Sequence, residues 1–141
     1  RAVVELIVEK PQAAAEGALT GVQSTVEHLR LTIQNNRDIM LQELRTFSDL
    51  RMIEPDGTFY CLPDFRAYTN DSVKLANFLL KKALVVAVPG QPFGMEGHLR
   101  LSFAGNAKDI IEAVKRIKWA LDPNAPNEIY IGDRKLIRDW L

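Results

Sequence analysis

The sequence is poor in the residue types from which disulfides and metal sites are built. Its 141 residues include one cysteine, Cys61, and two histidines, His28 and His98. A single cysteine cannot form an internal disulfide, and such sparing use is typical of a reducing compartment, so we expect a cytoplasmic protein. Two distant histidines and one cysteine offer no ligand spacing, so we expect no metal site. Cys61 lies in the apolar run FYCL and is predicted to be a buried, unreactive thiol.

An excess of charge and a long apolar run are also missing. The chain has 18 lysines and arginines against 18 aspartates and glutamates, so its formal net charge is zero. Without a basic surplus there is no electrostatic argument for nucleic acid or an anionic membrane, and we expect neither partner. No apolar run approaches the length that crosses a bilayer, and the N-terminus shows no signal-peptide pattern. A start at Arg1 favours a fragment or a processed chain.

The N-terminal third has the periodicity of helices. Residues 1–19 are predicted to be helical in two pieces, because Pro11 interrupts or restarts the pattern. A long amphipathic helix then runs to about residue 47, with a stripe of apolar residues at Val22, Val26, Leu29, Ile33, Met40, Leu44 and Phe47. Only the turn at Asn36 breaks this stripe, and the charged opposite face is expected to be solvated. Such a stripe must pack on another element of this chain or on another subunit.

Shorter elements follow from residue 49. LRMI and TFYCL flank an Asp-Gly turn and are predicted to form a hairpin over residues 50–62. Asn70 or Asp71 is expected to cap a helix that runs to about Lys82, with these residues facing inward: Val73, Ala76, Leu79 and Leu80. ALVVAV, residues 83–88, has the pattern of a strand that is buried on both faces.

Two stronger elements come last. HLRLSF, residues 98–103, alternates like a strand, and Asn106 is expected to begin a helix by capping it together with Asp109. The apolar stripe of that helix is Ile110, Val114, Ile117 and Leu121. DPNAPNE should end the helix through its two prolines. The pattern of the remaining tail leaves open whether it docks on the domain or forms a partner-binding arm.

The order strand, strand, helix, strand, strand, helix predicts an α+β fold. We expect a small mixed-sheet α-β sandwich with helices on one side, preceded by the long amphipathic helix. The predicted organisation is a helical connecting segment over residues 1–48, an α+β small domain over residues 49–121 and a C-terminal tail over residues 122–141.

No self-contained catalytic set is present among the residues. The stretch PGQPFGMEG has neither the spacing of a phosphate-binding loop nor the dinucleotide-binding fingerprint. The acids Glu54, Asp56 and Asp64 lie in turns, where hydrogen bonds to the local backbone explain them. Neither histidine pairs with a plausible nucleophile.

One cation, Arg100, stands at the centre of the strand over residues 98–103. Because alternate side chains share a face, Leu99 and Leu101 point to the core and Arg100 points away, toward the preceding loop. A guanidinium offers a planar pair of donors that match a carboxylate or a phosphate. The pattern alone leaves two alternatives open, an ion pair with a local acid or the binding of an anionic ligand.

Three groups of residues, in this order, resemble the C-terminal part of the class I/II, fold type I pyridoxal-phosphate aminotransferases, the group that contains aspartate aminotransferase. The groups are Gly57, Phe59, Tyr60, Pro63 and Asp64; Pro89, Gly90, Phe93 and Gly94; and Arg100, Leu101, Ser102, Phe103 and Ala104. The resemblance covers about residues 12–121. It implies the C-terminal domain of the pyridoxal-phosphate-dependent transferase fold, in a parent enzyme that is a homodimer.

The resemblance also implies roles for single residues. Arg100 would bind the α-carboxylate of an amino-acid substrate, and Tyr60, Gly90 and Phe93 would line the same pocket. The parent enzyme would transfer an amino group between an amino acid, with aspartate as the default, and a 2-oxo acid, using pyridoxal phosphate. The family's Schiff-base lysine and most phosphate ligands lie upstream of this sequence. We therefore expect no catalytic residue, no covalently bound cofactor and no transamination by this chain alone.

Two parts of the chain depart from the family pattern. LIVEK, residues 6–10, stands where the family often has a Ser-Asn-Pro-like stretch, and the tail after Leu121 has no match. Two other functions stay open beside the aminotransferase. One is a stand-alone domain that senses a carboxylate or a phosphate through Arg100, and the other is a dimerisation module built on the long helix.

Overall fold

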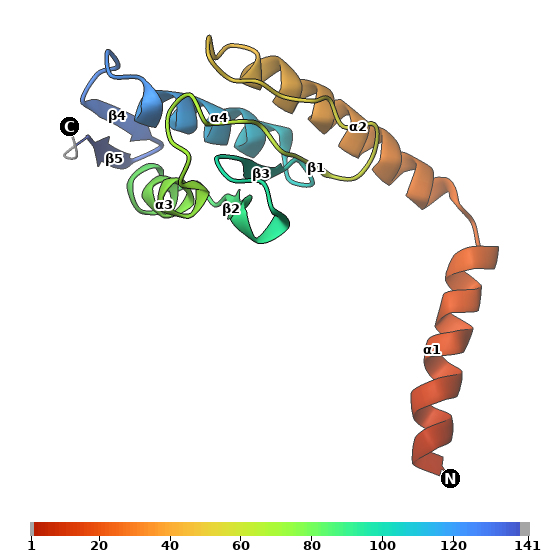
Figure 1. The fold of residues 1–141 in the computed structure, drawn as a ribbon. Coiled ribbons are helices and arrows are strands. Elements are labelled where there is room, and N and C mark those ends of the chain that lie inside the picture. Colours follow the sequence, from red (N-terminus) through yellow and green to blue (C-terminus); the bar gives the residue numbers. More distant parts are fainter. Residues whose placement is uncertain (1, 139–141) are drawn as a thin grey trace. The chain divides into compact units, whose positions relative to one another are not determined.

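The computed structural model describes residues 2–138 and divides the chain into two compact units, residues 1–32 and residues 33–141. Figure 1 shows the elements of both units. Predictions that fall on Arg1 and on residues 139–141 lie outside the described residues. Among the helices of the described part, none is long and apolar enough to cross a membrane.

The first two helices are α1 (Ala2–Thr20) and α2 (Ser24–Leu44). The predicted break at Pro11 is wrong, because α1 continues through this proline. The helix ends instead at Thr20, three residues after Gly17, and the amide of Gly21 still donates to the carbonyl of Gly17 over 2.9 Å. Gly21 disfavours continuation of the helix, because glycine loses more backbone conformational entropy on folding than any other residue.

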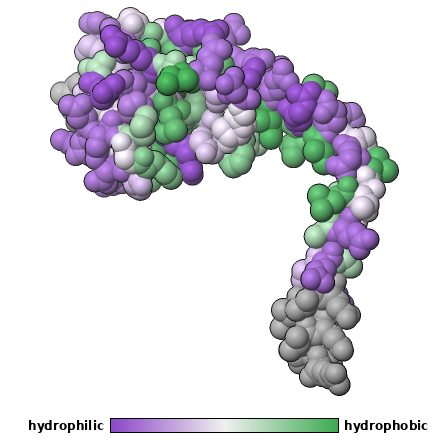
Figure 2. All heavy atoms as spheres, turned by 45° about the vertical axis from the view of Figure 1, so that its right-hand side comes forward, coloured by the Kyte–Doolittle hydropathy of each residue, from purple (hydrophilic) through white to green (hydrophobic). Residues whose placement is uncertain are grey.

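The apolar stripe of α2 is buried in its second half only. Met40 and Leu44 are buried, and so is Phe47 just beyond the helix, whereas Val22 and Leu29 are exposed. In Figure 2, hydrophobic side chains lie among hydrophilic ones along the first unit. The expectation that the stripe packs on this chain is thus confirmed from Met40 onward.

Asn36 has a specific reason to interrupt the stripe. Its side chain is buried, and Nδ2 donates to the carbonyl of Phe103 over 3.1 Å and to that of Gly105 over 2.8 Å. Both carbonyls come just after the strand over residues 99–102, so this amide ties α2 to the end of that strand. A buried amide with its donors satisfied is compatible with an otherwise apolar face.

The small sheet has three strands in the order β1-β3-β2: β1 (Tyr60–Cys61), β3 (Leu99–Ser102) and β2 (Val88–Pro89). Both outer strands pair with β3 in the antiparallel sense, so the predicted mixed sheet is wrong. Met40 and Leu44 of α2 share one core cluster with Leu99 and Leu101 of β3. The central position of β3 places Arg100 in the middle of the sheet.

The predicted hairpin over residues 50–62 does not form. Residues 50–53 make a single bridge, from Arg51 to Asp64, and β1 pairs with β3 instead. The Asp-Gly segment is a bend that continues to Thr58, whose φ is 67°. A turn signal predicts a reversal of the chain, but the partner of TFYCL is chosen by the core face that Cys61 shares with Leu101.

The third helix, α3 (Ser72–Phe78), begins where it was predicted, with the carboxylate of Asp71 accepting from the amide of Lys74 over 2.8 Å. A π-helical turn, η1 (Leu79–Ala83), follows and ends at Leu84, whose φ is 55°. The predicted inward set is partly wrong, because Val73 and Leu80 are exposed. The buried residues of α3 and η1 are Ser72, Leu75, Ala76, Leu79 and Ala83, and the first four have the ordinary spacing of one helix face, which starts one residue earlier than predicted.

The prediction of a strand buried on both faces over residues 83–88 is also wrong. Only Val88 belongs to a strand, and Val86 is 79% exposed. Val85 alone of the three valines is buried, with its amide bound to the carbonyl of Leu79. The apolar run over residues 83–88 therefore ends η1 at its first residue, and the residues after it connect η1 to β2.

The helix α4 (Ala107–Leu121) begins after Asn106 as predicted, but the side chain of Asn106 accepts from the amide of Lys108 over 2.9 Å and not from that of Asp109, so the predicted capping box is not formed. The proline-containing segment follows the end of the helix. Three of the four predicted stripe residues are buried, namely Ile110, Val114 and Ile117. They join Leu99, Leu101, Phe103, Met40 and Leu44 in one core cluster.

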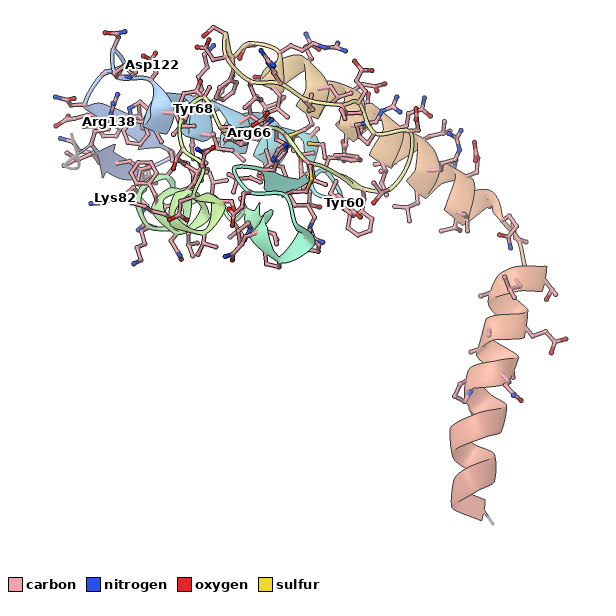
Figure 3. All side chains as sticks on the ribbon, viewed as in Figure 1. Tyr60, Arg66, Tyr68, Lys82, Asp122 and Arg138 are labelled. Carbon is pink, nitrogen blue, oxygen red and sulfur yellow. The ribbon has the colours of Figure 1, made fainter. Side chains whose placement is uncertain are left out.

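The tail folds as a hairpin of β4 (Glu128–Ile131) and β5 (Arg134–Ile137). Leu136 is buried, and the guanidinium of Arg138 donates to the carbonyls of Asp122 and Ala125 over 2.6 and 3.1 Å. Arg138 lies beside the hairpin and Asp122 at the end of α4 (Figure 3). The sequence left open whether the tail docks on the domain or forms a partner-binding arm. In the structure, the described residues of the tail dock on the domain.

Candidate functional site

The alternation of β3 separates Arg100 from the core. Leu99 and Leu101 are buried on one face, whereas Arg100 is half-buried on the other. In the register of the sheet, Val88 lies opposite Arg100, and Tyr60 lies opposite Ser102. Directly opposite residues of an antiparallel pair share a face, so Tyr60 belongs to the same side of the sheet as Arg100. The predicted orientation of Arg100 is confirmed.

Two aromatic rings flank the guanidinium of Arg100. Its Cζ lies 5.0 Å from the ring centroid of Tyr60 and 5.2 Å from that of Phe93. Cation–π attraction at such distances favours the charged group over the ring faces. Tyr60 is in turn held by Phe59, whose ring meets it edge-on at 5.5 Å (Tyr60 is labelled in Figure 3). The rings orient the guanidinium plane without using its N–H donors.

No acid among the described residues occupies the donors of Arg100. Among residues 2–138, no carboxylate forms an ion pair with Arg100 within 4.0 Å. Of the two alternatives that the sequence left open, the local ion pair is therefore not made. A planar cation with available donors, half-buried between rings, is suited to a carboxylate or a phosphate.

The loop from Pro89 to His98 carries Phe93 to this place. The amide of Gly90 donates to the carbonyl of His98 over 2.8 Å, and the amides of Phe93 and Met95 donate to the carbonyl of Gly90 over 2.9 and 3.0 Å. A Cβ at Gly90 would lie 2.2 Å from the carbonyl oxygen of Met95, so no other residue fits there. Phe93 belongs to a short 3-10 turn, η2 (Gln91–Phe93).

A pocket of about 500 Å³ opens beside Tyr60. Apolar side chains dominate its wall, including Met52, Ile53 and Met95, and its polar side chains include His98 and Asp64. Of the predicted site residues only Tyr60 is among the residues that line this pocket, and Arg100, Gly90 and Phe93 are not. Nδ1 of His98 lies 2.9 Å from the carbonyl oxygen of Glu96, which can only accept, so Nδ1 carries the proton. Sequence reasoning missed His98 as a pocket residue, although its place two residues before Arg100 puts it on the same face.

The acids predicted to lie in turns behave as structural groups. The carboxylate of Asp64 accepts from the backbone amide and the guanidinium of Arg66, which together hold the pKa of this carboxyl well below its usual 3.8, at about 2. The local backbone hydrogen bond predicted for Asp64 is confirmed, but Asp64 lies in isolated bridges to Arg51 and His98 and not in a turn. For Glu54 the prediction of a local backbone bond is wrong, because its carboxylate pairs with the side chain of Arg45.

The residues considered for metal or thiol chemistry are not assembled. In the described part of the chain, no three His, Cys, Asp or Glu side chains come together as a metal site. Cys61 is buried, and burial raises the pKa of its thiol to about 12. The predicted burial of this cysteine is confirmed, and the raised pKa disfavours its thiolate at neutral pH.

Comparison with known proteins gives consistent matches. Residues 8–117 match the family described as aminotransferase class I and II. A probable aspartate/prephenate aminotransferase of Aquifex aeolicus (strain VF5) is 41% identical over 100 residues, which are 69% of this chain and 25% of that protein. The chain thus spans about a quarter of the length of the curated relatives it matches.

Solved structures agree with the sequence matches. An aromatic aminotransferase from Pyrococcus horikoshii OT3 is similar with a TM-score of 0.70 and 32% identity, over 76% of this chain and 30% of that one. An aspartate aminotransferase from Thermus thermophilus with maleate has a TM-score of 0.62 and 35% identity, over 67% of this chain and 24% of that one.

Proposed function

The chain belongs to the class I and II aminotransferases, and from this premise we propose that it is the C-terminal part of such an enzyme, the part that binds the carboxylate of the substrate. The parent enzyme transfers an amino group between an amino acid and a 2-oxo acid. The observation that carries the proposal is Arg100, a half-buried guanidinium between two rings that no acid among the described residues neutralises.

Arg100 acts by binding and orientation. Its two parallel N–H donors bind the two oxygens of a carboxylate, which sets both the position and the plane of that group. The rings of Tyr60 and Phe93 hold the guanidinium plane in advance, so less side-chain freedom is lost when the carboxylate binds. Gly90 lets the loop close tightly enough to present Phe93, and in this sense Tyr60, Gly90 and Phe93 line the site.

The cofactor belongs to another part of the parent enzyme. The family implies pyridoxal phosphate, which supplies the electron sink for amino-group chemistry when it is bound. A resident pyridoxal phosphate needs a lysine at the site, and none of the described residues that line the pocket beside Tyr60 is a lysine. The residues of this chain do not fit the cofactor by themselves. They supply the carboxylate-binding end of the site, and we propose that the isolated chain does not transaminate.

The wider organisation follows the same proposal. Residues 1–48 connect to a larger domain, residues 49–121 form the small domain, and residues 122–141 form the tail, which docks on the small domain in its described part up to residue 138. The parent is a cytoplasmic homodimer. Aspartate is the default donor, supported by the names of the relatives from Aquifex aeolicus and Thermus thermophilus and by the maleate in the latter structure, a dicarboxylate.

Kinetics of the parent enzyme test this function. Losing a charged contact to the substrate costs about 2–5 kcal/mol, so Arg100→Ala should lower kcat/KM for the amino acid at least about thirtyfold. Arg45→Ala is the matched control, because Arg45 is exposed and pairs only with Glu54 among the described acids. A change below about threefold for Arg100→Ala would contradict the role.

The coding sequence upstream of Arg1 is the second test. It should encode a large domain with a lysine in the family's Schiff-base position. A reading frame that begins just before Arg1 would contradict the enzyme and favour a stand-alone domain that senses carboxylates through Arg100.

A further inference from the structure

Ser72 has a buried hydroxyl that the proposed carboxylate site does not explain. The residue opens α3 and is completely buried, although Asp71, not Ser72, caps the helix. Its Oγ accepts from the amide of Gln91 over 3.2 Å and donates to the carboxylate of Glu96 over 3.3 Å. One hydroxyl therefore contacts both limbs of the loop that carries Phe93.

Phe93 depends on this loop for its position. Its side chain is 54% exposed, so burial against the core does not hold the ring over Arg100. The ring is placed by η2, whose first residue is Gln91, the residue that donates to Ser72. At the other limb, the carbonyl of Gly97 accepts from the amide of Phe65 over 2.8 Å. The loop is thus anchored at both limbs, and Ser72 is the side-chain anchor next to Phe93.

We propose that Ser72 is a positioning residue for the carboxylate site: it sets Gln91, and through η2 the ring of Phe93, and so fixes the plane in which Arg100 presents its donors. This inference rests on the proposed function of Arg100. A hydrogen bond to a backbone amide near the start of η2 restrains the whole turn, because η2 has only three residues. Ser72 itself does not touch the substrate.

The experiment uses the 141-residue chain with maleate as the probe. Maleate-induced NMR shifts of the β3 amides give a dissociation constant. The part of the ring-current shift of the Arg100 side-chain protons that Phe93→Ala removes reports the ring of Phe93, apart from that of Tyr60 and independently of maleate. Ser72→Ala should raise the dissociation constant about three- to tenfold, the effect of one lost hydrogen bond, and should reduce the ring-current shift. Ser48→Ala is the control, because Ser48 is exposed and its Oγ donates to the neighbouring Asp49.

A double-mutant cycle separates positioning from a general structural role. If Ser72 acts through Phe93, Ser72→Ala should add almost nothing in a Phe93→Ala background. Glu96→Ala removes the second partner of the hydroxyl from an exposed position, and a smaller shift in the same direction is expected. An unchanged ring-current shift in both Ser72→Ala and Glu96→Ala overturns the inference. Full additivity of the Ser72 and Phe93 changes overturns it as well.

The same measurements distinguish failure of the proposed function of Arg100 from failure of the inference about Ser72. If Arg100→Ala leaves maleate binding unchanged, Arg100 is not the carboxylate site, whereas the ring-current comparison still decides whether Ser72 positions Phe93. If Arg100→Ala abolishes binding but Ser72→Ala has the affinity and ring-current shift of the unmodified chain, only the inference about Ser72 fails.

Discussion

Cys61 sits on the core face of β1, opposite Leu101 of β3. Burial raises the pKa of its thiol to about 12, so almost no thiolate exists at pH 8. We expect a disulfide reagent to modify the native chain at least about a hundred times more slowly than the chain in denaturant, because reaction requires opening of the structure. The rate of thiol release, followed by absorbance, checks this. Equal rates in the two conditions would show that Cys61 is accessible.

Asp64 gives the chain a defined response to acid. Its pKa, held at about 2 by the hydrogen bond from Arg66, lies below the ordinary value of 3.8. A carboxyl whose pKa is lowered by folding contributes stability above pH 4, and this contribution is lost as the pH falls toward 2. Because Arg66 is mostly exposed, the contribution should not exceed about 1 kcal/mol.

Urea unfolding at several pH values measures this contribution. Asp64→Asn should be less stable than the unmodified chain at pH 5, and the difference should shrink as the pH falls from 4 to 2. Asp56→Asn, in the exposed bend, is the control and should behave like the unmodified chain. A difference between Asp64→Asn and the unmodified chain that grows with acid would contradict the sign.

At the scale of an element, α2 offers two leucines in opposite environments. Leu44 is 1% exposed in the core, and Leu29 is 59% exposed. Truncating a buried leucine removes apolar contact and leaves a cavity, so Leu44→Ala should lower the free energy of unfolding by about 2–5 kcal/mol. Leu29→Ala should change it by less than about 0.5 kcal/mol. Urea denaturation of both variants checks the pair, and equal losses would mean that the first half of α2 is also packed.

The C-terminal hairpin depends on Arg138. Its guanidinium donates to two carbonyls and lies 5.9 Å from the ring centroid of Trp119, while the side chain is buried. Arg138→Ala should lower the free energy of unfolding by about 1.5–3 kcal/mol, the range for hydrogen bonds that involve a charged group. Arg134→Ala, which replaces an exposed arginine of β5, should change it little. Hydrogen exchange of the β4–β5 amides checks the local effect, and protection that survives in Arg138→Ala would exclude Arg138 as the anchor.

At the scale of the whole molecule, this chain is predicted to lack the cofactor chemistry of its family. Mixed with pyridoxal phosphate, it should give only the weak, reversible absorbance of scattered surface lysines, because no lysine lines the pocket beside Tyr60 within the described residues. Absorbance spectra before and after dialysis check this expectation. A stable Schiff-base band that disappears when one particular lysine is replaced would contradict the division of the enzyme proposed above.

The sequence by itself determined the features that depend on neighbours along the chain. Side-chain oxygens at Asp71 and Asn106 start α3 and α4, because a cap bonds amides two or three residues away. The alternation of HLRLSF turned Arg100 away from Leu99 and Leu101, because successive side chains of a strand point to opposite faces. These patterns involve residues that are close in the sequence, and the structure contains the predicted helix starts and the predicted orientation of Arg100.

The tertiary structure alone decided which distant segments meet. The sequence could not tell that TFYCL pairs with β3 instead of with residues 50–53, since both segments are apolar enough to be its partner. In the sequence, Asn36 only interrupts the apolar stripe of α2. In the structure, its side-chain amide donates to the carbonyl of Phe103, 67 residues away. The two rings around Arg100 and the hydroxyl of Ser72 at Gln91 depend on how the loop from Pro89 to His98 closes, and that closure is set by packing across the fold.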